Sequence, residues 1–177
     1  MRLPDSLRVH LNGLRFVIVA LSMSPLLFLV VGFVAGKNEP STVTRVLAWA
    51  GAALGLVALG ARGPLRRALT ARGRRSIVNG TFRPHGAMSG PAWQQALASD
   101  GDTARLFSVY QSATIVPTAM MEAGALVAGV SFFLGGTYLA LGIAVGLVVL
   151  LFGLNFPTEH AVTDWLVEQQ KLLRADS

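Results

Sequence analysis

Residues 113–134 read ATIVPTAMMEAGALVAGVSFFL, an apolar run with a single charged residue, Glu122, near its middle. A helix needs about 20 apolar residues to cross the hydrocarbon of a bilayer, so this run predicts a transmembrane helix. An ionised acid at that depth is costly, which makes Glu122 the first candidate for a functional residue. Because 53% of the 177 residues are hydrophobic, further spans of this kind are expected elsewhere in the chain.

Three more apolar runs have a similar composition, and the four predicted spans are 16–35, 46–61, 113–134 and 137–156. Only Gly135 and Gly136 separate the last two spans, so these must form an antiparallel hairpin. The predicted fold is therefore an all-α membrane protein with four transmembrane helices, a cytoplasmic loop with short helices, and a C-terminal amphipathic helix.

Composition divides the chain into four parts. They are a first transmembrane pair (1–61), a basic cytoplasmic loop (62–105), a second transmembrane hairpin (106–157) and a cytoplasmic amphipathic tail (158–177). In the loop, the pattern predicts a short basic helix at 64–75 and a helix that holds Trp93 and ends at Gly101. We expect Trp93 to anchor at the membrane interface. The tail is expected either to lie on the membrane or to pack on the loop.

Basic residues outside the spans predict the orientation. Thirteen of the fifteen Arg and Lys residues lie in the N-terminal segment, the long loop and the tail, against two in the first connection. Basic residues near a span resist translocation, so both termini and the loop are predicted to be cytoplasmic, in a bacterial inner membrane. The alternative that 16–35 is a cleaved signal peptide is disfavoured, because this run is longer than a usual signal core.

Composition also disfavours several classes of function. The absence of Cys excludes disulfides and thiolate metal sites, and His10, His85 and His160 have no metal-ligand spacing, so no metal or other cofactor is expected. The net charge is +6, and most of the Arg and Lys residues that cause it lie beside the predicted spans. There they are expected to orient the chain in the membrane rather than to bind nucleic acid. No nucleophile elbow, phosphate loop or paired carboxylate set occurs in the sequence, so an enzyme is not expected.

The helix face that carries Glu122 consists mostly of small residues. Offsets of three, four and seven residues place Thr118, Ala125 and Gly129 on it, and a neighbouring helix can cover such a face. We therefore expect Glu122 to face protein. Burial away from water disfavours its charged form, so the acid is expected to be largely neutral and hydrogen-bonded, to Thr118 or to a facing carbonyl group.

Two prolines and a glycine pair mark special points in the spans. Pro25 and Pro117 each remove one backbone hydrogen bond, which predicts a kink in the first and third spans. Gly51 and Gly55 form a GxxxG pair that lets another helix approach closely. The pair serves either tight packing within the chain, which we favour, or dimerisation.

The short basic helix at 64–75 suits an anionic layer of lipid headgroups. The arginines that carry this hypothesis are Arg66, Arg67, Arg72, Arg74 and Arg75. The alternative, which the short apolar stripe favours, is a solvated loop whose charge only orients the protein.

Two interpretations of Glu122 stay open at this point. It is either a neutral packing residue that helps fix which helices meet, or a site that binds a proton or cation with Thr118. A single membrane acid favours packing, since proton relays use chains of titratable groups, but an oligomer would repeat the site. We expect a structural or accessory protein that packs with lipids, other membrane proteins or copies of itself through small-residue helix faces. An ion-binding oligomer is the alternative, and a small transporter subunit is a third.

Residues 117–134, PTAMMEAGALVAGVSFFL, resemble the carboxylate-bearing helix of rotary ATP synthase proteolipids (subunit c). The resemblance implies that Glu122 corresponds to the ion-binding carboxylate of that family. Arg62, Gly63 and Pro64 follow the Gly-rich second run and are similar to the family's polar loop, although proteolipids are usually two-helix hairpins and roughly 45 residues intervene here. The chain also resembles small uncharacterised bacterial inner-membrane proteins in its last span and tail, which implies only the architecture.

Overall fold

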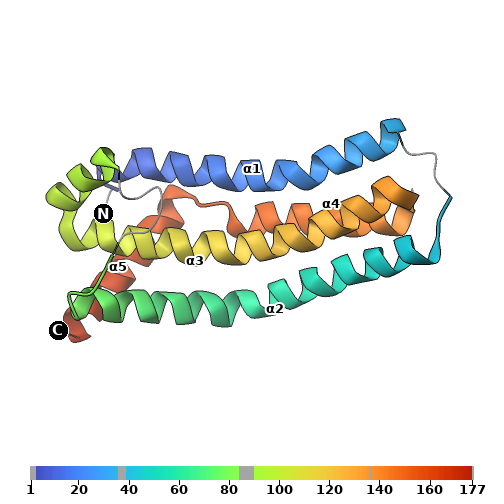
Figure 1. Cartoon of the computed structure of the whole chain (residues 1–177). Coiled ribbons are helices and arrows are strands. Elements are labelled where there is room, and N and C mark those ends of the chain that lie inside the picture. The colour runs from blue at the N-terminus through green and yellow to red at the C-terminus, as the bar shows by residue number, and fades with distance from the viewer. Residues whose placement is uncertain (1–2, 36–38, 84–89, 136, 177) are drawn as a thin grey trace. The chain divides into compact units, whose positions relative to one another are not determined.

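The structure is a computed structural model that describes residues 3–35, 39–83, 90–135 and 137–176. These residues form helices and no strand (Figure 1): α1 (Asp5–Ala35), α2 (Thr42–Val78), α3 (Pro91–Gly135), α4 (Tyr138–Asn155) and α5 (Glu159–Asp176). Helices α1 to α4 are each long and apolar enough to cross a membrane. The prediction of an all-helical chain with four such helices is thereby confirmed. His85 and Gly136 lie outside the described residues.

Helix α2 extends well beyond the predicted span. It continues through Pro64 to Val78, so the basic segment 64–75 continues the second helix and is not a separate one. The helix ends where Gly80 adopts a φ of 64°, with the N–H of Gly80 bonded to the carbonyl of Ile77 and the N–H of Thr81 bonded to that of Ser76. This is the Schellman arrangement, which satisfies carbonyl groups that the helix end leaves without partners. The end of the apolar run at Ala61 is thus not the end of the helix.

Helix α3 consists of two helical parts that meet at Gly101. This residue has φ 49° and ψ −117°, a conformation that glycine reaches without a steric penalty. The break lies where the sequence predicts a helix to end. Pro25 and Pro117 instead lie inside α1 and α3, and both helices continue through them.

The helices pack into two compact units. Unit 1 comprises Met1–Arg15, Leu65–Thr114 and Pro157–Ser177, and unit 2 comprises Phe16–Pro64 and Ile115–Phe156. The N-terminal segment, most of the expected loop and the expected tail therefore belong to one unit. Helices α1, α2 and α3 each contribute residues to both units.

Unit 1 has a core of large apolar side chains. On α1, Leu7, Leu11 and Leu14 recur at helical spacing and are fully buried. Trp93 on α3 is only 1% exposed and packs edge-on against the ring of His10, with 4.9 Å between ring centroids. The expectation that Trp93 anchors at the membrane interface is therefore wrong, because its indole ring fills the interior of this unit.

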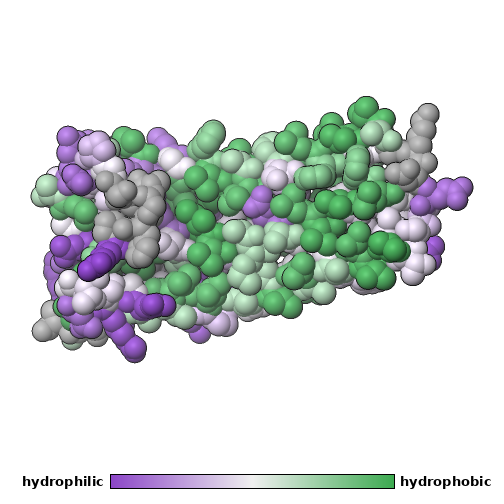
Figure 2. All heavy atoms as spheres, viewed as in Figure 1, coloured by the Kyte–Doolittle hydropathy of each residue, from purple (hydrophilic) through white to green (hydrophobic). Residues whose placement is uncertain are grey.

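Unit 2 buries many small residues beside a few large ones such as Phe132 and Leu151, and it exposes many large apolar residues. Ala48, Ala128 and Ala144 are completely buried, whereas Val34 is 84% exposed and many other Val, Leu and Phe side chains also point outward. Figure 2 shows the resulting hydrophobic surface in green, with hydrophilic atoms within it. Soluble monomers rarely expose apolar patches larger than a few hundred Å², whereas small-residue helix contacts are typical of helices packed in lipid.

Candidate functional site

Glu122 lies half-buried on α3, and the side chain of Ser24 on α1 lies near its carboxyl group. Ser24 is also half-buried and directly precedes Pro25. Thr118, the partner that the sequence suggested, is fully buried one turn earlier on α3. Sequence reasoning missed Ser24, since the helix register that brings the two side chains together is a property of the tertiary fold.

Glu122 sits at the edge of the covered part of α3. On one side, Gly129 lies against α1, because a Cβ atom added to it would be 3.5 Å from the carbonyl oxygen of Pro25. On the same side, Ala125 is buried in a cluster with Leu147 of α4. On the other side, Ala119 and Ala123 are exposed. The acid therefore faces protein with only part of its surface, and the rest is open.

The Gly51–Gly55 pair packs α2 against α3. A Cβ atom on Gly51 would lie 2.8 Å from the backbone nitrogen of Ala128, and one on Gly124 would lie 2.8 Å from the backbone nitrogen of Gly55. This GxxxG pair is thus used for packing within the chain, the interpretation that we favoured. Sequence reasoning missed Gly124, although Gly124 and Ala128 form a small-xxx-small pair that could have indicated the contact.

Polar side chains make two further contacts between helices of unit 2. Nε of Arg62 on α2 donates a 3.0 Å hydrogen bond to Oδ1 of Asn155 on α4. On α3, Oγ of Ser131 donates to the carbonyl oxygen of Thr44 at 2.5 Å, which joins α3 to the start of α2. Sequence reasoning singled out neither Asn155 nor Ser131.

The five candidate headgroup-binding arginines lie in two kinds of environment. Arg66 is half-buried, with its guanidinium carbon 5.4 Å from the ring centroid of Tyr110. Arg74 is also half-buried and donates from Nη1 to Oε1 of Gln169 on α5, at 3.4 Å. The other three, Arg67, Arg72 and Arg75, are exposed. Two of the five therefore hold unit 1 together, and three are available to a ligand.

The chemistry of the Glu122 site is limited to a carboxyl group and a hydroxyl group. Within the described ranges, no three His, Cys, Asp or Glu residues lie together as metal ligands. Such a pair can bind a proton, accept hydrogen bonds or pair with a cation from another helix. No family of proteins, curated protein or solved structure was found to match the chain.

Proposed function

We propose that this protein is an accessory subunit of a membrane complex and that the α1–α3 face around Glu122 binds a transmembrane helix of a different protein. The observation that carries the proposal is that Glu122, beside Ser24, is only partly covered by the protein. A carboxyl group that faced lipid would be unfavourable, by about 2.5–3.5 kcal/mol on insertion scales for an ionised acid. A partner helix that covers the group removes this penalty.

The partner is expected to carry a Lys or Arg residue within its own span. The four apolar runs of this chain contain neither residue, so a second copy cannot neutralise Glu122 from within the membrane. A basic residue in the partner would be equally unfavourable in lipid, and the two charges stabilise each other when the helices pair. Ala119 and Ala123 are exposed beside Glu122, and such small residues let the partner's backbone approach closely.

The proposed location is a bacterial inner membrane, with the four apolar helices across the bilayer and both termini in the cytoplasm. The excess of basic residues in the N-terminal segment, the 62–105 region and the tail supports this orientation. Exposed arginines such as Arg67 and Arg75 would then face the anionic cytoplasmic leaflet.

The test is the mass of the complex extracted from native membranes in a mild detergent. Wild-type protein is expected to run with a partner of a different mass. Glu122→Ala should release it as the free chain, whereas Val149→Ala, at an exposed position on α4, should not. A free wild-type chain, or a complex that Glu122→Ala leaves intact, would contradict the proposal.

A second candidate function is proton or cation binding by an oligomer. Ser24 favours it because its hydroxyl oxygen adds a ligand beside the carboxyl group, and Pro25 leaves the carbonyl of Leu21 without its usual helix donor. Carbodiimide labelling of Glu122 separates the two functions. Labelling that depends on pH or is blocked by sodium, in a complex made only of this chain, supports ion binding. Labelling that is suppressed only in the complex with another protein supports the accessory role.

A further inference from the structure

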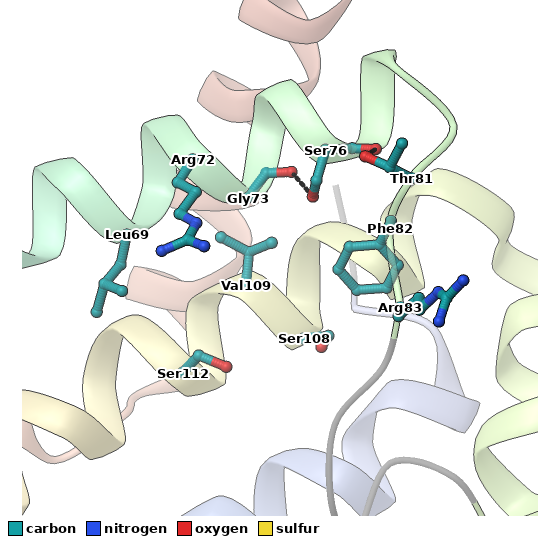
Figure 3. Close-up of a pocket in the computed structure, with 10 residues that line it drawn as sticks. All are labelled: Leu69, Arg72, Gly73, Ser76, Thr81, Phe82, Arg83, Ser108, Val109 and Ser112. Atoms are coloured by element: carbon teal, nitrogen blue, oxygen red, sulfur yellow. Dashed lines mark hydrogen bonds between the residues drawn. The ribbon is translucent and has the colours of Figure 1, made fainter.

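A cavity of about 590 Å³ lies within unit 1, between α2 and α3 (Figure 3). Its volume falls within the range of roughly 300–1,000 Å³ that is usual for small-molecule sites. The α2 side contributes Arg72 and Ser76, the chain just after α2 contributes Phe82, and α3 contributes Ser108 and Ser112. The cavity is separate from Glu122, whose neighbours belong to unit 2.

Positive charge is available at this cavity. Arg72 and Arg83 both line it and are exposed, and within the described part of the chain neither guanidinium forms an ion pair or hydrogen bond. Figure 3 shows the Arg72 side chain extending from α2 toward α3, and Arg83 beyond Phe82 at the edge. By contrast, Arg105 nearby on α3 is paired with Asp102 at 3.1 Å. The cavity therefore presents cationic groups that the fold leaves uncompensated.

Hydroxyl groups line the same cavity. Ser112 is exposed on α3 and Ser108 is buried below it. On α2, Oγ of Ser76 donates to the carbonyl oxygen of Gly73 at 2.7 Å, so its proton is already used within the helix. Ser112 is therefore the hydroxyl group that can donate to a ligand, and proteins use a planar guanidinium together with such a donor to bind phosphate oxygens.

The rest of the lining is apolar. Leu69, Val109 and Phe82 line the cavity, and Figure 3 shows Phe82 on one side of Val109 and Arg72 on the other. Gly73 brings the two helices together here, because a Cβ atom at this position would lie 2.5 Å from Cγ2 of Val109. The site thus combines a cationic, hydroxyl-lined end with an aromatic wall, which suits a phosphate group attached to an organic moiety.

We propose that this cavity binds a phosphoester, with Arg72 and Ser112 holding the phosphate and Phe82 contacting the organic part. The ligand comes either from solution, as a phosphorylated small molecule, or from the bilayer, as the headgroup of an anionic phospholipid. Both sources offer the same chemistry to Arg72.

The test measures binding to the full chain purified in a nonionic detergent or placed in nanodiscs. The soluble probes are adenosine monophosphate and, as a control without phosphate, adenosine. The lipid arm compares nanodiscs of phosphatidylglycerol with nanodiscs of phosphatidylcholine. Arg72→Gln is the site variant, and Arg67→Gln, which removes the same charge from an exposed position of α2 outside the cavity, is its matched control.

Arg72→Gln is expected to weaken binding of the phosphoester about 10-fold or more, which is the effect of losing hydrogen bonds to a charged group. Arg67→Gln should change it less than 2-fold, and Ser112→Ala should weaken it by an intermediate factor. Saturable binding of the nucleotide assigns the soluble source, and a preference for phosphatidylglycerol that Arg72→Gln removes assigns the lipid. Equal effects of the two arginine variants, equal binding of adenosine, or no binding in either arm would overturn the proposal.

Discussion

Arg62 on α2 and Asn155 on α4 are joined by a 3.0 Å hydrogen bond from Nε to Oδ1. Asn155 is only 6% exposed and also donates from Nδ2 to the carbonyl of Leu151 at 3.1 Å. The guanidinium of Arg62 additionally donates to the carbonyl of Leu154. A charged side chain thus provides donors for two oxygens in the last turn of α4, which ties α2 to α4 within unit 2.

Replacing Asn155 with Leu keeps the branching of the side chain, with bulkier methyl groups, but removes the acceptor for Arg62. We expect the free energy of unfolding in mild detergent to fall by about 1–3 kcal/mol, because the half-buried, charged guanidinium of Arg62 loses an acceptor. Asn79→Leu is the control, since Asn79 is exposed after the end of α2. Equal stability of the Asn155 and Asn79 variants would show that this contact contributes nothing.

Gly124→Ala should destabilise unit 2, although it adds a single methyl group. The added Cβ atom would lie 2.8 Å and 3.0 Å from backbone atoms of α2, which cannot move without separating the helices. We expect a loss of about 1–3 kcal/mol, seen as a lower melting temperature.

Gly142→Ala is the matched control for this change, because nothing lies within 4 Å of the corresponding position on α4. Alanine is favoured over glycine inside a helix by roughly 0.5–1 kcal/mol, so this variant should be as stable as wild type or more so. Equal melting temperatures of the Gly124→Ala and Gly142→Ala proteins would contradict the close α2–α3 contact.

Tyr110 on α3 and Trp165 on α5 form an edge-to-face pair in unit 1, with 5.2 Å between ring centroids. In a double-mutant cycle with alanine at both positions, the double variant should lose about 0.5–1.5 kcal/mol less than the sum of the two single losses, because each single variant already breaks the contact. Denaturation of the four proteins measures this difference, the coupling free energy. A coupling free energy of zero would contradict the packing of Trp165 on α5 against Tyr110 on α3.

The four long helices could be predicted because their apolar runs are nearly continuous and long enough for a bilayer. The fourth was the most accurate, 137–156 against Tyr138–Asn155, since Thr137 caps its start and Pro157 follows its end. The end of α2 was not predicted. Gly63 and Pro64 indicate a break in the helix, but α2 continues through both residues. It ends only where the Schellman arrangement forms at Gly80.

The candidate site could be predicted only in part. Glu122 is conspicuous as a lone acid among apolar residues, and Gly51 with Gly55 has a recognisable spacing. Ser24 and Asn155 have no such signal, since a small polar residue acquires its role only when a second helix presents a partner. Trp93 was misjudged for a related reason, because an indole ring suits a membrane interface and a helical core equally well.

The central claim is that another protein's helix covers Glu122, and photo-crosslinking in native membranes tests it most directly. A photoreactive amino acid placed at Ala123, which is exposed beside the acid, should yield one discrete protein adduct whose crosslinked span contains Lys or Arg. The same probe at Val149, which is 64% exposed, should give lipid adducts only, and adding Glu122→Ala should abolish the Ala123 product. An adduct that persists without Glu122, or lipid adducts alone at Ala123, would contradict the account.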